Sequence, residues 1–347
     1  HETVHSIPAA AHQLRDLVRG ASSIVILTHA NPDADAVAAA LGMRTLVRNF
    51  GVEPTLVASG DAALPSNLEF LNGAIDLKQA DDDAVRDADL LILVDCSDPS
   101  RLGPLFYRLA GEFERSRTIV NIDHHITNHR VGTLNLVVPE SASTAEIIVG
   151  LFDELGVEIE SECATILLAG IYGDTLGLRT PSTTPASLRT AAELIEAGAD
   201  MDAIVDALFR LKPYSTICLW GEALQRAQWR GALMWTQVDP EMLERTGADR
   251  TEAEGIVNFL AGTIGARASA LLYQESWGWR VSMRSLADDV DVSKLLGLFG
   301  GGGHPRAAGA RLDAGDEARE RFLEEISSRL GPRGDVTGAS YSGDEPD

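Results

Sequence analysis

Short apolar runs that alternate with amphipathic segments dominate the first half of the chain. Five runs are typical of strands that are buried on both faces: SIVIL (23–27), VEPTLVA (52–58), ADLLILVD (88–95), RTIVNID (117–123) and TLNLVV (133–138). A helix is expected over residues 33–50, where Gly51 ends it, and another near residues 102–115. This alternation predicts an α/β fold with a doubly wound, mostly parallel sheet.

The second half has a different pattern. Residues 143–229 contain successive helical segments that end at glycines, and strand-like runs begin near residue 231. ALMWTQV, ARASALLYQE and WRVSMRS are these runs, and a helix near residues 315–330 follows them. We therefore expect a smaller α/β domain at the C-terminal end. The predicted boundaries are a first domain (1–180), a helical linker region (181–229), a second domain (230–331) and a disordered tail (332–347).

Composition limits the possible cellular compartments and binding partners of the protein. No apolar run reaches the length of a membrane span, and the first ten residues lack a signal-peptide pattern. The three cysteines, at positions 96, 163 and 218, have no paired spacing, which fits a reducing cytoplasm. The net charge of −23, from 52 acids and 29 bases, argues against binding of long duplex nucleic acid. The composition is compatible with small anionic substrates held by metal ions. Much of the acidity is explained by its contribution to solubility.

Acids and histidines follow three of the predicted strands. THANPDADA places His29, Asp33 and Asp35 after the first strand, and LVDCSD places Asp95 after another. Asp33 could simply cap the next helix, and Asp95 could simply form a turn. In open parallel sheets, however, ligands gather outside the carboxyl ends of the strands.

IDHHITN adds the third strand end, with Asp123, His124 and His125. Adjacent side chains on a strand point to opposite faces, so the two histidines are expected to serve different purposes. A further acid, Asp174, ends an apolar helix, where a negative charge is unfavourable unless a cation lies nearby. It could also be an ordinary loop residue. Imidazole and carboxylate groups at one crevice are suitable ligands for two Mn²⁺ or Mg²⁺ ions.

A glycine run in the second domain is the last candidate. Gly300 to Gly303 precede His304, and glycines allow a ligand to approach the backbone closely. Arg284, on the preceding strand-like run, could bind a phosphate or a base. The alternatives are a flexible loop and a solvated surface arginine.

These motifs, in this order, resemble those of the DHH phosphoesterase superfamily over roughly residues 10 to 330. THANPDADA, LVDCSD, IDHHITN and GDTLGLRT are similar to its four N-terminal motifs, and GGGHPRAAG is similar to the signature of the DHH-associated C-terminal domain. The nanoRNase group within it is the most similar, and implies an active site in an inter-domain cleft. In the fourth motif the group usually has Asp-Thr-Gly-Ser-Phe-Arg, whereas residues 174–179 here are DTLGLR. This departure puts the substrate preference in question.

The resemblance implies a hydrolase of phosphate esters that uses two Mn²⁺ ions, with Mg²⁺ or Co²⁺ as alternatives. His29, Asp33 and Asp95 would hold one ion, and Asp35, Asp95, His124 and Asp174 the other. A water activated by both ions would attack phosphorus, His125 would contact the phosphoryl group or transfer a proton, and Asp123 would orient a ligand. The substrate would be bound by Arg284, Gly301, Gly302, Gly303 and His304.

The implied substrates are short oligoribonucleotides, cut to mononucleotides, and 3′-phosphoadenosine 5′-phosphate (pAp), converted to AMP. The enzyme would thus be an oligoribonuclease and exonuclease as well as a pAp phosphatase, without a membrane partner. A homodimer is a further expectation of the resemblance. Cyclic or linear dinucleotides and polyphosphate are alternative substrates, and a catalytically inactive nucleotide-binding regulator is a remoter alternative.

Overall fold

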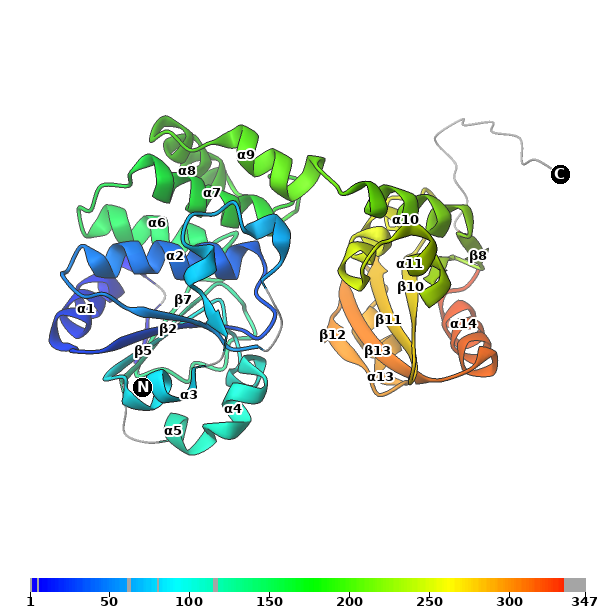
Figure 1. The fold of residues 1–347 in the computed structure, drawn as a ribbon, viewed down its shortest axis with the longest axis horizontal. Helices are drawn as coiled ribbons and strands as arrows, with labels where there is room; N and C mark the ends of the chain where they lie inside the picture. Colours follow the sequence, from blue (N-terminus) through cyan, green and yellow to red (C-terminus); the bar gives the residue numbers. More distant parts are fainter. Residues whose placement is uncertain (1, 5, 61–63, 80, 115–117, 334–347) are drawn as a thin grey trace. The chain divides into compact units, whose positions relative to one another are not determined.

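The computed structural model describes residues 2–4, 6–60, 64–79, 81–114 and 118–333. The chain divides into two compact units, residues 1–211 and 212–347 (Figure 1). The segment 181–229 that was predicted as a linker is shared between these units, and most of the predicted tail lies outside the described residues. No helix of the described residues is long and apolar enough to cross a membrane.

The first unit contains a seven-stranded sheet in which every neighbouring pair is parallel. Its strand order is β1 (Glu2–Val4), β7 (Leu134–Val137), β6 (Thr118–Asp123), β5 (Leu90–Val94), β2 (Ile24–Thr28), β3 (Thr55–Ala58) and β4 (Lys78–Gln79). From β2 the chain runs outward to β3 and β4 and then returns to β5 on the other side of β2. The predicted doubly wound fold is therefore confirmed, with its switch point between β2 and β5.

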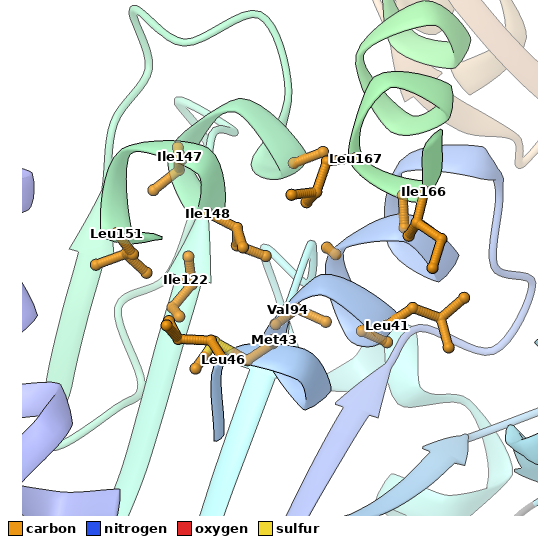
Figure 2. Packing of buried hydrophobic residues seen from close by; sticks show 14 of the residues in the cluster. Leu41, Met43, Leu46, Val94, Ile122, Ile147, Ile148, Leu151, Ile166 and Leu167 are labelled. Carbon is orange, nitrogen blue, oxygen red and sulfur yellow. The ribbon is translucent and has the colours of Figure 1, made fainter. Parts of the chain in front are cut away.

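Both faces of this sheet are buried because successive strand residues alternate between two cores. Ile24 and Ile26 of β2 join the core under one set of helices, whereas Val25 and Leu27 join the core on the opposite face. The first set contains α1 (Ile7–Gly20), α2 (Ala34–Arg48), α6 (Thr144–Glu154), α7 (Ser161–Asp174), α8 (Pro185–Glu196) and α9 (Met201–Val205), with the π-helix η4 (Asp206–Arg210). Figure 2 shows leucine and isoleucine side chains of α2, α6 and α7 packed over Val94 and Ile122.

Short helices cover the opposite face. They are α3 (Asp82–Asp87), α4 (Pro104–Arg108), α5 (Ala110–Glu114) and the 3₁₀ helix η3 (Pro99–Leu102). The single helix expected near residues 102–115 was wrong in this respect, because Gly103 adopts φ 59° and Pro104 starts a new helix. Two further 3₁₀ helices, η1 (Ser66–Leu68) and η2 (Ala74–Asp76), lie between β3 and β4.

The second unit contains a six-stranded mixed sheet. Its order is β12 (Gly302–His304), β13 (Ala307–Asp313), β11 (Gly278–Ser285), β10 (Ala268–Glu275), β9 (Leu233–Val238) and β8 (Gln228–Arg230). Only β9 and β10 pair in parallel. One face packs on α13 (Val292–Gly297) and α14 (Asp316–Leu330), and the other on α10 (Tyr214–Gln225), α11 (Pro240–Thr246), η5 (Arg250–Ala253) and α12 (Ile256–Leu260). This confirms the predicted smaller α/β domain.

Candidate metal centre and substrate face

The candidate metal ligands of the first unit lie at the carboxyl ends of three neighbouring strands. His29 follows β2, Asp95 follows β5, and Asp123 is the last residue of β6. Because β2, β5 and β6 are adjacent and parallel, these ends meet at one edge of the sheet. The position next to the switch point is where open α/β sheets bind ligands.

His29, Asp33 and Asp95 form the first group of potential ligands. One ligand atom from each lies within 4.8 Å of the others. The imidazole Nε2 of His29 is 3.7 Å from Oδ2 of Asp95, and both side chains are buried. Asp33 is also the N-cap of α2, since its Oδ1 accepts hydrogen bonds from the backbone N–H groups of Asp35 and Ala36. The capping interpretation therefore holds for one carboxylate oxygen without excluding a ligand role for the other.

Asp35, His124 and Asp174 form the second group, again within 4.8 Å. Nε2 of His124 is 3.1 Å from Oδ2 of Asp174, which ends α7. The Asp35 carboxylate is buried and accepts hydrogen bonds from the backbone N–H groups of Thr144 and Ala145, at the start of α6, at 2.7 and 2.9 Å. The positive end of α6 thus holds a carboxylate that would otherwise be costly to bury.

A third group joins the first two, because Asp95 and His124 belong to it together with Asp123 and His125. Nδ1 of His125 lies 2.7 Å from Oδ1 of Asp123 and 3.6 Å from Oδ1 of Asp95. Asp123 is fully buried, and its other oxygen accepts a 2.6 Å hydrogen bond from Asn128. Asp123 therefore fixes the ring of His125, while the ring of His124 is directed to the second group.

The close spacing of buried acidic side chains shifts the pKa values of this cluster. Burial, and then the charges of Asp95 and Asp174, raise the pKa of Asp35 well above its usual value. Asp33 keeps some exposed surface, but protein atoms crowd its carboxyl group and raise its pKa, with Asp95 adding to the effect. Asp95 is the opposite case: burial alone would raise its pKa, but His29, His124 and His125 outweigh it and lower the pKa to about 2.

The pKa of His124 is likewise set by burial and by neighbouring charges that act in opposite directions. Burial favours the neutral imidazole, but Asp174 and Asp35 outweigh it and raise the pKa to about 10. A proton on His124 thus partly compensates the surrounding carboxylates, which is the task that a bound cation would take over.

The donor set fits divalent metal ions. The Nε2 atoms of His29 and His124 are buried and make no hydrogen bond with the described residues, although both point at carboxylates. Buried polar atoms are normally satisfied, so two orphaned imidazole nitrogens indicate missing partners. Asp95, between the groups, has φ 54°, an unusual conformation that is frequent at functional sites.

The predicted substrate residues lie together in the second unit. In the sheet register His304 of β12 is opposite Ala307 of β13, which is opposite Arg284 of β11. Opposite residues share a face, so the imidazole and the guanidinium stand on the same side with the small Ala307 between them. Gly302 and Gly303 belong to the edge strand β12, whereas Gly300 and Gly301 precede it. A side chain at Gly301 or Gly303 would collide with the backbone of β13.

Arg284 differs from many arginines of this chain in having no carboxylate partner within ion-pair distance among the described residues. Its Nε donates a 2.7 Å hydrogen bond to Oδ1 of Asn258 on α12, and an Nη donates to the carbonyl of Met283. Burial lowers the pKa of the guanidinium. A half-buried cation that lacks a neutralising acid is suited to an anionic ligand.

Sequence reasoning missed the residues that support these groups. Thr144 donates from its hydroxyl to Asp95 (3.1 Å), Asn128 bonds Asp123, and Asn258 bonds Arg284. Asn128 lies inside the IDHHITN motif, so its position was a usable signal. Thr144 and Asn258 lie on helices that are distant in sequence from their partners, and no sequence motif indicated their roles.

The first unit thus combines a doubly wound sheet with clustered groups that could hold metal ions, and among the described residues Arg284 of the second unit has no carboxylate within ion-pair distance. These features are those expected of a metal-dependent protein that acts on anions. Residues 23–171 match the family described as "DHH family, N-terminal domain", and residues 236–331 match the "DHHA1 domain". The chain is 35% identical over 312 residues to a "Bifunctional oligoribonuclease and PAP phosphatase NrnA" of Thermus thermophilus, covering 88% of this chain and 90% of that protein. The chain therefore belongs to the DHH family.

Two further relatives agree. A protein of Bacillus subtilis with the same description is 28% identical, over 88% of this chain and 94% of its own length. The solved structure of an exopolyphosphatase-related protein from Bacteroides fragilis superposes with a TM-score of 0.84 at 22% identity, covering 93% of this chain and 97% of that one. At that identity the structure supports the fold alone.

Proposed function

We propose that this protein is a metal-dependent phosphoesterase that hydrolyses short oligoribonucleotides to mononucleotides and pAp to AMP. The observation that carries the proposal is the set of linked ligand groups, in which Asp95 and His124 each belong to two groups. Similarity to proteins described as oligoribonucleases and PAP phosphatases, over nearly nine-tenths of the chain, supports these substrates.

The roles of the residues follow from their contacts. His29, Asp33 and Asp95 would hold one divalent ion, and Asp35, His124 and Asp174, with Asp95 nearby, would hold a second. When bound, two such ions supply an activated water and neutralise charge on the phosphoryl group. Their proposed identity is Mn²⁺, because imidazole ligands suit it better than Mg²⁺.

The chain's own groups do the remaining work. The Asp123 carboxylate lies 2.7 Å from Nδ1 of His125 and orients that ring. We infer that His125, when protonated, would donate to a phosphoryl oxygen or give its proton to the leaving oxygen. Arg284 and His304, on one face of the second sheet, would bind the non-reacting part of the nucleotide. A small anion site of this kind lets a chain with a net charge of −23 act on short RNA without a basic track for long strands.

The test is turnover with Mn²⁺ present on pAp, a ladder of RNAs from the dinucleotide upward, cyclic di-AMP and polyphosphate. We expect AMP from pAp and mononucleotides from the shortest RNAs, with rates falling as the strand lengthens. The matched variants are Asp95→Asn, which should abolish turnover, and Asp83→Asn, an exposed acid outside the cluster, which should not. Hydrolysis of polyphosphate alone, or no turnover of any substrate, would overturn the proposal.

A further inference from the structure

Two leucines next to the metal centre have an unfavourable backbone conformation. Leu176 has φ 50° and Leu178 has φ 63°, in the turn that follows Asp174. Residues with a Cβ atom avoid this left-handed region, which glycine enters freely. Asp95 and Arg130 are the other positive-φ residues besides glycine in the described part of the chain, and an aspartate tolerates the region better than a leucine does.

The turn is held in this shape by internal hydrogen bonds. The Thr175 hydroxyl donates to the carbonyl of Ile171 (2.6 Å) and accepts from the N–H of Leu178 (2.9 Å). Nε of Arg179 donates to the carbonyl of Leu176 at 2.6 Å. The conformation is therefore imposed by the turn and is independent of the side chain at position 176.

Packing explains one leucine and not the other. Leu178 is half-buried and packs against the main core of the first unit. Leu176 is 48% exposed and joins none of the hydrophobic clusters of the described residues. Because Leu176 is exposed, no packing of its side chain offsets the strain of its backbone conformation. Strained backbone conformations of this kind are frequent at functional sites.

The position of Leu176 indicates what it could contact. It lies two residues after Asp174, so the two Cα atoms are separated by about 7 Å at most, and the Asp174 carboxylate is 3.1 Å from His124. A leucine side chain forms no hydrogen bonds and would not stabilise a phosphate. The apolar part of a nucleotide close to its reacting phosphate is the nucleoside, whose base and sugar faces can cover an exposed aliphatic group.

We propose that Leu176 is a specificity-determining residue that contacts the base of the nucleoside next to the scissile phosphate. The inference rests on the proposed function and adds to it a preference for substrates that carry a base at this position. It predicts that the leucine strengthens substrate binding and has little effect on the chemical step. Phosphate compounds without a base gain nothing from it.

The test compares Leu176→Gly with the wild type on pAp and on the abasic ribose 3′,5′-bisphosphate. Glycine relieves the strain, so the melting temperature should be unchanged or about 2–4 °C higher. The KM for pAp should rise about tenfold with kcat within about twofold, because one aliphatic contact is lost. The KM for the abasic compound should not change, and Leu176→Met should restore wild-type binding of pAp.

Leu178→Gly is the matched control, since it relieves similar strain but removes a packed side chain. It should lower the melting temperature and leave the ratio of the two KM values unchanged. If Leu176→Gly has a wild-type KM for pAp while the wild type is active, the role of Leu176 is overturned and the proposed function stands. If the wild type hydrolyses neither pAp nor short RNA, both proposals fail.

Discussion

The two candidate sites of this protein have opposite electrostatic character. In the first unit acids are buried so densely that the pKa of Asp35 rises and His124 holds a proton up to about pH 10. In the second unit Arg284 is half-buried with an amide partner and no carboxylate within ion-pair distance among the described residues. The first arrangement calls for cations and the second for an anion. The difference shows that a chain can offer binding groups for cations in one unit and for an anion in the other while its net charge stays strongly negative.

The two sites also differ in how they are assembled. The metal cluster draws residues from three strand ends and two helices, spread from His29 to Asp174. The substrate face uses neighbouring strands of one sheet, where register alone aligns Arg284 with His304. We expect the cluster to respond to single substitutions with total loss, and the face to respond in graded steps.

The largest expected effect is that of Asp95→Asn. Asp95 belongs to the first ligand group, and its Oδ1 lies 3.7 Å from Nε2 of His124 in the second group. One change at this position should therefore weaken both proposed metal sites. We expect turnover of pAp to fall by about 10³-fold or more, as for removal of a central electrostatic stabiliser. Calorimetric titration with Mn²⁺ should show weaker binding or fewer bound ions.

Asp83→Asn, at an exposed position on α3, is the control for that loss and should bind Mn²⁺ as the wild type does. Near-normal activity of Asp95→Asn would show that the cluster is a structural network of acids and histidines. In that case the contrast between the two sites would lose its functional meaning.

Much of this architecture was predictable from the sequence for a physical reason. Strands such as β2 and β5 are buried on both faces and are therefore continuously apolar, and polar residues just after them must lie at the edge of the sheet. Asp95 and the Asp123–His125 motif could be read in this way. Asp33 was read equally well as a cap or a ligand, and the structure shows that its cap uses only one oxygen.

Other features had no local signal. Thr144 and Asn258 act on residues 49 and 26 positions away, and only the tertiary fold brings these pairs together. The left-handed conformation of Leu176 was equally hidden, because leucine at a turn position gives no indication of positive φ. The break of the helix after Leu102 depended on a glycine conformation that composition does not determine.

The second prediction concerns the pH dependence of metal binding. A metal ligand must be a neutral imidazole, but His124 carries a proton in the metal-free protein because its pKa is raised to about 10. Binding of an ion therefore releases this proton at neutral pH, and the apparent Mn²⁺ affinity should rise about tenfold for each unit of pH below that pKa. The raised pKa of Asp35 should steepen the dependence on the acidic side.

Titration calorimetry in buffers of different ionisation enthalpy measures the released protons directly. At least one proton per protein should be released in the wild type, and fewer in His124→Gln. A pH-independent affinity would mean that His124 is already neutral or is not a ligand. It would contradict the view that the buried acids of the first unit need a bound cation.

The smallest expected effect is that of Asn258→Ala on the substrate face. The amide oxygen of Asn258 fixes the guanidinium of Arg284 without neutralising it, which distinguishes this pair from the ion pairs elsewhere in the chain. Loss of the amide should raise the KM for pAp about three- to tenfold and leave kcat nearly unchanged, since one orienting hydrogen bond is removed. Arg284→Ala should raise the KM further, by about 10- to 100-fold.

The double variant separates positioning from an independent contact. If Asn258 acts only through Arg284, the variant that lacks both should match Arg284→Ala, because the two effects are then coupled. Asn258→Asp should keep the guanidinium in place but supply the missing negative charge, so its KM should rise and depend less on salt than that of the wild type. Additive losses in the double variant would instead show that Asn258 contacts the substrate itself, and the second unit would then recognise its ligand by more than an unpaired charge.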